Sequence, residues 1–227
     1  MTTILYHYPI SPFSRKVRLM LAEKGINFEL KTENFWERRR KFLAMNPASQ
    51  VPVLIEENYN DKPILLSEST AICEYLEEKY PEPQLIGSDI LERAEIRRVS
   101  GWFNNKFYYE VTKYIVDEKV YKFLRKQGEP NSHYLRAAKN NIIDHLDYIA
   151  FLLRTRKWLA GEKFSLADIT AVAQLSVLDF LGDVPWDHNQ EVKEWYCVIK
   201  SRPSFRQFFD DYIPGLEPSK NYKCLDF

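Results

Sequence analysis

Strand and helix signals occupy separate parts of this chain of 227 residues. Residues 1–80 alternate between short β-prone runs and amphipathic helical runs, in the order β-α-β-α-β-β-α. From Ser88 onward the strand signal disappears and only helical stretches follow. A mixed block followed by an all-helical block indicates two domains. We therefore predict an α/β domain over residues 1–80, a linker over residues 81–87, an all-α domain over residues 88–213 and an extended tail over residues 214–227.

Capping and turn residues give the expected boundaries of these elements. Ser11 stands at the N-cap of a helix that begins with proline and that Gly25 ends. Ser67 is expected to cap the helix after the last strand, and Ser165 and Asp168 have the spacing of a capping box. The expected strands cover residues 4–8, 28–32, 51–55 and 63–66. The other expected helices cover residues 37–45, 68–79, 90–126, 134–154, 166–181 and 190–202.

Composition and charge exclude several classes of function. The 32 Lys and Arg residues balance the 32 Asp and Glu residues, so no net field steers the chain toward nucleic acid or a membrane. The sequence has no glycine-rich phosphate loop, and its 3 cysteines are too widely spaced for a disulfide framework or a zinc ribbon. The histidines have no partners at metal-ligand spacing, so we expect no metal. Without a membrane-spanning run or a leader peptide, a cytoplasmic protein is expected.

Four stretches of sequence, in this order, resemble the glutathione S-transferase superfamily. They are residues 11–18 (SPFSRKVR), 46–54 (NPASQVPVL), 68–76 (ESTAICEYL) and 161–169 (GEKFSLADI). Each stretch is weakly specific by itself, but together they span nearly the whole chain. The resemblance implies a thioredoxin-like α/β domain that binds glutathione, followed by an all-α domain, with a homodimer as the assembled form.

Ser11 is the candidate for activating the glutathione thiol. A free thiol is only slightly ionised at neutral pH, and a hydroxyl at a helix N-terminus stabilises the thiolate through a hydrogen bond and the helix dipole. In the serine-type transferases that the chain resembles, the matching residue has this role. The alternative is that Ser11 only caps its helix. Tyr6, Tyr8 and Ser14 are the other candidates for the contact with the thiol.

The remaining glutathione contacts are implied by the resemblance. In thioredoxin-like folds the peptide bond before Pro52 is cis, and the backbone of Val51 is then open to pair with a peptide like an added strand. We therefore expect Gln50, Val51 and Pro52 to bind glutathione. Glu68 and Ser69 begin a helix whose N-terminus favours an anion, and they are expected to bind the γ-glutamyl group.

Aromatic residues on the first long helix of the second domain are candidates for the pocket of an apolar electrophile. Together with Tyr8, the expected lining is Trp102, Phe103 and Phe107, because the corresponding helix of relatives faces the glutathione site. Packing in the core or in a dimer interface is the alternative for each ring.

Other stretches resemble one bacterial subgroup of the superfamily, the transferase-like division factors that bind FtsZ filaments. These stretches are residues 101–107, 178–187, 200–205 and 222–227. This second resemblance implies a non-catalytic dimeric adaptor that contacts the filament through the helical domain and the tail, with Leu225 and Phe227 as exposed apolar residues.

Two hypotheses about function therefore stand, because a fold does not fix a function. The main one is glutathione-dependent conjugation of small apolar electrophiles, with glutathione as co-substrate. The alternative is the adaptor on the FtsZ filament.

Overall fold

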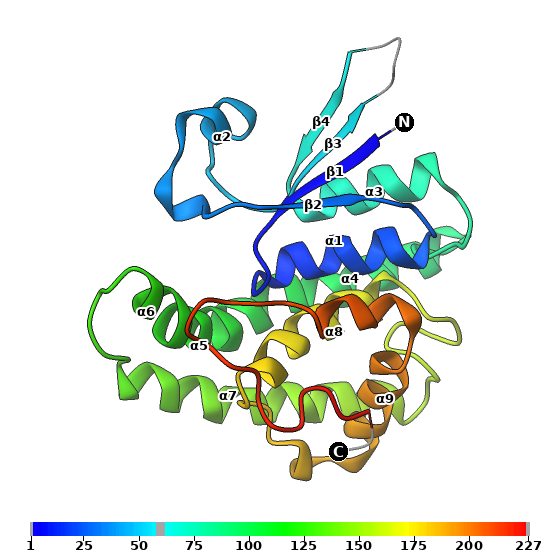
Figure 1. The fold of residues 1–227 in the computed structure, drawn as a ribbon. Helices are drawn as coiled ribbons and strands as arrows, with labels where there is room; N and C mark the ends of the chain where they lie inside the picture. Colours follow the sequence, from blue (N-terminus) through cyan, green and yellow to red (C-terminus); the bar gives the residue numbers. More distant parts are fainter. Residues whose placement is uncertain (1, 58–61, 226–227) are drawn as a thin grey trace. The chain divides into compact units, whose positions relative to one another are not determined.

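The computed structural model describes residues 2–57 and 62–225. The chain divides into two compact units, Met1–Leu85 and Ile86–Phe227 (Figure 1). The first unit is α/β and the second is helical, which confirms the predicted fold class of a thioredoxin-like domain followed by an all-α domain.

A four-stranded mixed sheet is the centre of the first unit, with strand order β2-β1-β3-β4. Strands β1 and β2 are parallel, whereas β1 with β3 and β3 with β4 are antiparallel. Leu5 of β1 lies opposite Leu54 of β3 and Leu30 of β2 in the register. Helices α1 and α3 pack side by side against this sheet (Figure 1). The strands are β1 Thr2–His7, β2 Glu29–Thr32, β3 Val53–Glu57 and β4 Ile64–Ser67, and the helices are α1 Pro12–Glu23, 3-10 turn η1 Phe35–Glu37, α2 Arg40–Met45 and α3 Ser69–Lys79.

Helix α1 begins and ends where the sequence predicts. The backbone of Ser11 is extended, its side chain accepts a hydrogen bond from the N–H of Ser14, and Pro12 is the first helical residue. Lys24 is the C-cap, and Gly25 follows with a φ of 65°, a left-handed conformation that glycine adopts without a steric cost.

The prediction of one helix over residues 37–45 is wrong. A short 3-10 turn comes first, Arg38 then adopts a left-handed conformation with a φ of 50°, and α2 begins only at Arg40. The physical reason lies in the charges. Arg39 forms an ion pair with Glu33, whose side chain is buried, and this contact with a residue outside the helix sets the course of the backbone here.

The predicted cap of α3 is also wrong. Ser67 is the last residue of β4, and the N-cap of α3 is Glu68, with a φ of 76°. The longer side chain of Glu68 reaches back to the first free N–H groups of the helix and takes the place that we expected for the Ser67 hydroxyl.

The second unit begins with a continuous helical rod that contains two π-helical stretches. Such stretches are rare and often occur at functional sites. Helix α8 packs against α4 and η2 of this rod, and all fifteen of its residues are buried. The elements are α4 Ile90–Gly101, π-helix η2 Trp102–Thr112, α5 Lys113–Val116, π-helix η3 Asp117–Tyr121, α6 Lys122–Leu124, α7 Ser132–Leu153, α8 Leu166–Phe180, 3-10 turn η4 Trp186–His188, α9 Gln190–Lys200 and 3-10 turn η5 Pro203–Phe208.

The predicted capping box of α8 is confirmed. The N–H of Ala167 donates to Ser165 Oγ, and the N–H of Ser165 donates to Asp168 Oδ2 at 3.1 Å. Asp168 also accepts hydrogen bonds from the N–H of Leu159 and from the indole of Trp195. Because its carboxylate is fully buried, the pKa of Asp168 rises to about 6 in spite of these donors.

The tail differs from its prediction in one respect. Most of residues 214–225 lack regular structure, as expected, but Tyr222 is buried and not part of an exposed end. Leu225 is 42% exposed, and Phe227 lies outside the described residues.

Because of His7, the stability of the first unit depends on pH. The ring of His7 is buried on β1, and Nδ1 has no hydrogen-bond partner among the described residues. Burial, and then the charges of Arg18 and Arg15, lower the pKa of His7 to about 3. The folded protein therefore keeps His7 neutral.

We predict that His7→Asn removes part of the loss of stability at acidic pH. Because the pKa of His7 is lowered on folding, its contribution is complete above the unfolded pKa of about 6.5 and is lost as the pH falls toward about 3. Between pH 7 and pH 5 the free energy of unfolding should fall by about 2 kcal/mol less in His7→Asn than in the wild type. Urea unfolding at both pH values measures this difference. His133→Asn, at an exposed position, should keep the wild-type dependence; equal pH dependence in all three proteins would contradict the prediction.

Candidate functional site

Ser11 lies at the N-terminus of α1, where the sequence predicts the thiol-activating group. Its side chain is buried, and Oγ accepts a hydrogen bond from the N–H of Ser14 at 3.2 Å. Ser14 Oγ in turn accepts from the N–H of Tyr8 at 3.4 Å. Ser11 therefore caps α1, and Ser14 ties the start of α1 to the residue after β1. Accepting this hydrogen bond leaves the O–H of Ser11 able to donate, so capping and contact with a thiol are compatible.

The two tyrosines that compete for the thiol contact pack against other aromatic rings. The ring of Tyr8 is buried, with its centroid 4.8 Å from that of Trp36 and 6.4 Å from that of Phe35. Burial raises the pKa of Tyr8 to about 12, so its phenol stays protonated at neutral pH. Tyr6 contacts Phe42 of α2, at 6.1 Å between centroids. Aromatic contacts thus hold η1 and α2 to β1.

The Val51–Pro52 peptide bond is cis, as the sequence predicts. The pairing of β3 begins only at Val53, and the backbone N–H and C=O of Val51 form no hydrogen bond within the described part of the chain. The C=O of the exposed Gln50 accepts from Asn46 Nδ2 at 2.8 Å. Val51 therefore has backbone groups that an extended peptide can pair with.

Ser49 occupies the turn before this edge. Its φ of 52° is left-handed, which is unfavourable for a residue with a Cβ. The hydroxyl of Ser49 donates to the C=O of Phe35 at 2.7 Å and so fixes the turn to η1.

The N-terminus of α3 already holds a carboxylate of the chain itself. The two oxygens of Glu68 accept hydrogen bonds from the N–H groups of Thr70 and Ala71, at 3.0 Å and 2.9 Å. Ser69 Oγ lies 3.4 Å from Glu68 Oε1, so the two predicted ligands of the γ-glutamyl group contact each other. Burial by itself would raise the pKa of Glu68, but these N–H groups and the nearby Lys16 ammonium hold it below its ordinary value.

Lys16 is a part of this site that the sequence analysis missed. Its side chain is buried, and Nζ donates to Thr70 Oγ1 at 3.4 Å. Burial lowers the pKa of Lys16, whereas Glu68 and Cys73 oppose that shift. The sequence gives no signal for this position, because the run Ser14 to Leu21 contains three basic residues and its burial is visible only in the structure.

The predicted electrophile-pocket residues of the second unit have two kinds of surroundings. Phe103 and Phe107 are fully buried, with 5.6 Å between their centroids, and they belong to the core of the helical unit. Trp102 is partly exposed and stacks on Tyr148 at 4.2 Å. Tyr8, the fourth residue of the predicted set, belongs to the N-terminal unit.

His145 forms a hydrogen-bonded chain with Trp102 that the sequence analysis also missed. The indole of Trp102 donates to His145 Nδ1 at 3.0 Å, so the proton of the neutral ring is on Nε2, which lies 3.1 Å from Glu110 Oε2. Glu110 pairs with Lys106 as well. Burial lowers the pKa of His145, although Glu110 opposes this. Both nitrogens of the ring are therefore engaged by the chain itself.

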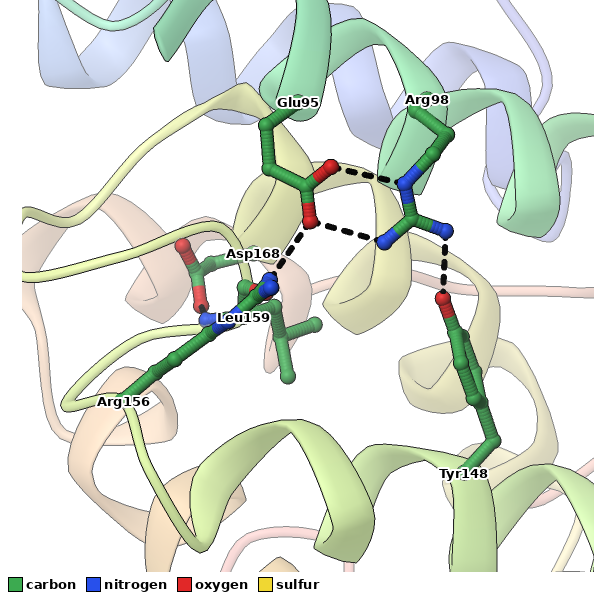
Figure 2. A network of polar contacts seen from close by, with 6 residues as sticks. All are labelled: Glu95, Arg98, Tyr148, Arg156, Leu159 and Asp168. Carbon is green, nitrogen blue, oxygen red and sulfur yellow. Dashed lines mark hydrogen bonds and ion pairs between the residues drawn. The ribbon is translucent and has the colours of Figure 1, made fainter. Parts of the chain in front are cut away.

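Figure 2 shows how the adjoining network continues from Tyr148 toward α8. The Tyr148 hydroxyl accepts from Arg98, which forms two hydrogen bonds with Glu95, and Glu95 also pairs with Arg156 at 2.6 Å. The hydrogen bonds with Arg98 are the main reason that the pKa of Glu95 falls to about 2. Arg156 donates to the C=O of Leu159, whose N–H donates to Asp168. This network joins α4, α7 and α8.

Within residues 2–57 and 62–225, no group of three or more His, Cys, Asp or Glu side chains is placed to hold a metal ion. Among the helices of the same ranges, none combines the length and the apolar character that crossing a bilayer requires.

Comparison with known proteins identifies the family of both units. Residues 5–84 match the model for the N-terminal domain of glutathione S-transferases, and residues 115–203 match the model for their C-terminal domain.

Individual relatives match over almost the full length. The chain is 44% identical to FtsZ-localized protein A of Caulobacter vibrioides, over 98% of this chain and 97% of that protein. The crystal structure of a glutathione S-transferase from Rhodospirillum rubrum matches with a TM-score of 0.96 and 46% identity, and it covers 100% of both chains. The structure of FzlA from C. crescentus matches with a TM-score of 0.97 and 44% identity, also over 100% of both chains. From both domain models and these full-length matches, this chain belongs to the glutathione S-transferase superfamily, as its sequence motifs predict.

Proposed function

We propose that this chain is a cytoplasmic, non-catalytic adaptor that binds the FtsZ division filament. The observation that carries the proposal is the 44% identity, over nearly all of both chains, to a protein named for its localisation with FtsZ. The resemblance of residues 178–187 and 222–227 to the division factors agrees with it. The surfaces assigned to the filament are the helical unit and the tail.

The state of the candidate glutathione site is a second support. Ser11 caps α1, and Glu68 occupies the N-terminus of α3 where the γ-glutamyl carboxylate would bind. A ligand at that position would have to displace a carboxylate that already accepts two backbone hydrogen bonds. This arrangement favours a binding protein over an enzyme that must hold glutathione tightly.

Glutathione conjugation is the second candidate function, and the open backbone of Val51 favours it. Glutathione fits the residues in part. Val51 and Pro52 would bind the peptide, Glu68 and Ser69 would have to turn toward its γ-glutamyl group, and the Ser11 hydroxyl would stabilise the thiolate, which is the nucleophile toward an apolar electrophile.

We predict that the protein sediments with FtsZ polymers and that removal of residues 222–227 abolishes this. The reason is that Leu225, an apolar residue near the end of the tail, is 42% exposed. Sedimentation with polymers formed in GTP, over a concentration series, measures the affinity. Ser11→Ala is the control and should bind like the wild type. Wild-type protein that stays in the supernatant at all concentrations would exclude the adaptor function.

Ser11→Ala separates the two candidate functions. We expect a loss of about 1 kcal/mol in the free energy of unfolding, because the N-cap hydrogen bond disappears. Ser11→Asn should retain most of the stability, since asparagine caps helices as well as serine does. Urea unfolding measures both changes. A measurable conjugation rate that falls roughly ten- to a hundredfold in Ser11→Ala would instead establish the enzyme.

A homodimer is part of this proposal, and exposed apolar residues on α4 support it. Ile90 and Leu91, in the first turn of α4, are 83% and 76% exposed. We predict that the wild type sediments as a dimer at micromolar concentration and that Ile90→Glu with Leu91→Glu shifts it toward the monomer. Phe151→Glu, at an exposed apolar position on α7, is the control and should leave the dimer intact. A wild-type monomer would refute the prediction.

A further inference from the structure

The C-terminal segment is held against the helical unit by specific contacts. We call residues 213–225 the strap; in Figure 1 it is the red trace that follows η5. Ile213 is buried and pairs with Leu216 in an isolated β-bridge. Gly215, with a φ of 76°, passes so close to α6 that an added Cβ would lie 2.8 Å from the Phe123 ring. The route of the strap past α6 therefore depends on the absence of a side chain at position 215.

The middle of the strap binds the end of α8. The N–H of Ser219 donates to the C=O of Phe180 at 2.8 Å, and Ser219 Oγ donates to the C=O of Asp179 at 2.7 Å. Both carbonyls lie in the last turn of α8, where a helix runs out of internal partners. The C=O of Asp179 also accepts from the N–H of Gly182, and the strap adds to these C-terminal hydrogen bonds of a buried helix.

A buried ion pair lies beneath this contact. Lys200 of α9 is fully buried, and its Nζ lies 3.0 Å from Asp179 Oδ2. Trp186 and Tyr196 also donate to the Asp179 carboxylate. Burial raises the pKa of Asp179, and Lys200 opposes that shift. A buried pair of this kind is costly to break, because either partner alone would be an uncompensated charge.

The strap contributes directly to the surroundings of the Lys200 ammonium. The C=O of Asn221 lies 3.4 Å from Nζ, and the ring centroid of Tyr222 lies 5.6 Å from it. Tyr222 is 1% exposed, and its ring meets Phe180 at 5.2 Å and Phe209 at 5.8 Å between centroids. One face of the buried cation is therefore covered by the strap.

The chain emerges from this contact within one residue. Lys223, Cys224 and Leu225 are all exposed, although Tyr222 beside them is buried. Three extended residues span at most about 10 Å, so the fixed position of Tyr222 limits where the exposed end can lie. A segment held in one region loses less entropy on binding than a free one does.

We propose that Asp179, Lys200 and Tyr222 form an anchor that positions the exposed end of the strap, residues 223–225, for binding to the FtsZ filament. This inference rests on the proposed function. The three anchor residues are positioning residues, and the contact with the filament is made by the end that they hold.

Tyr222→Ala tests the anchor, with Tyr222→Phe as its matched control. Loss of the buried ring should release the strap, so that its backbone amides exchange hydrogen at least about tenfold faster. Phenylalanine keeps the ring over Lys200 and loses the long, 3.5 Å hydrogen bond from the Tyr222 hydroxyl to the C=O of Phe208. Hydrogen exchange of a strap peptide and circular dichroism of the whole protein measure release and folding separately.

Filament binding of the same variants then tests the role of the anchor. Tyr222→Ala should weaken sedimentation with FtsZ polymers by about tenfold or more, to the level of a protein without residues 223–227, whereas Tyr222→Phe should bind like the wild type. A released strap with wild-type affinity would overturn the inference, as would a strap that stays protected in Tyr222→Ala. Absence of binding by the wild type would refute the proposed function itself, and the exchange result would then report on the anchor alone.

A second variant tests the anchor without the cavity that Tyr222→Ala would leave in the core. Lys200→Met together with Asp179→Asn removes both charges and leaves no unpaired one, so the helical unit should stay folded. The strap should again exchange faster and filament affinity should fall. Unchanged exchange and unchanged affinity in this double variant would show that the ion pair has no part in the anchor.

Discussion

Helix α8 is buried along its whole length, so its two carboxylates need partners inside the protein. The two acidic residues near its ends meet this requirement in related ways. Asp168 accepts from Trp195, and Asp179 accepts from Tyr196 and Lys200, all three on α9. One helix therefore supplies partners to both ends of another. Leu159 and Ser165 also donate to Asp168, and Trp186 also donates to Asp179. Ser219 of the strap donates to the C=O of Asp179.

The N-terminal unit satisfies its buried polar groups by using its own side chains as caps. Ser11 caps α1 and Glu68 caps α3, while the ammonium of Lys16 lies below the second of these caps. In an enzyme of this fold the same helix ends would be offered to glutathione. The superfamily fold is retained, and the carboxylate of Glu68 occupies the N-terminus of α3, whereas the backbone N–H and C=O of Val51 form no hydrogen bond within the described residues. That combination is consistent with a fold reused for binding another protein.

Much of the fold and part of the site could be predicted from the sequence, because they depend on local signals. The Ser11 cap, the glycine that ends α1 and the capping box at Ser165 involve residues within a few positions of each other. The cis bond before Pro52 came from the resemblance to the family. The predictions that were wrong, for α2 and for the cap of α3, involve side-chain contacts that the local sequence pattern does not show. Arg39 pairs with Glu33 instead of extending α2, and a longer side chain than that of Ser67 caps α3.

Contacts between distant parts of the sequence could not be predicted at all. Tyr222 looked like part of a free end because its neighbours are polar, yet its partners Phe180 and Phe209 are brought to it only by the packing of the helical unit. His145 and Trp102 are likewise joined across two helices. Within each unit, the structure was needed to decide which aromatic rings are core and which are surface.

The serine at position 49 has a consequence for motion in the N-terminal unit. A glycine there would leave the turn before Pro52 free to move without disturbing its surroundings. The Ser49 hydroxyl instead holds the C=O of Phe35, and Phe35 and the adjoining Trp36 pack on Tyr8. The turn and the aromatic segment are thereby coupled, so that opening either on the microsecond timescale of loop motion requires breaking the other's contacts. In this chain a movement of the turn before Pro52 therefore has to carry η1 with it or break the hydrogen bond from Ser49 to Phe35.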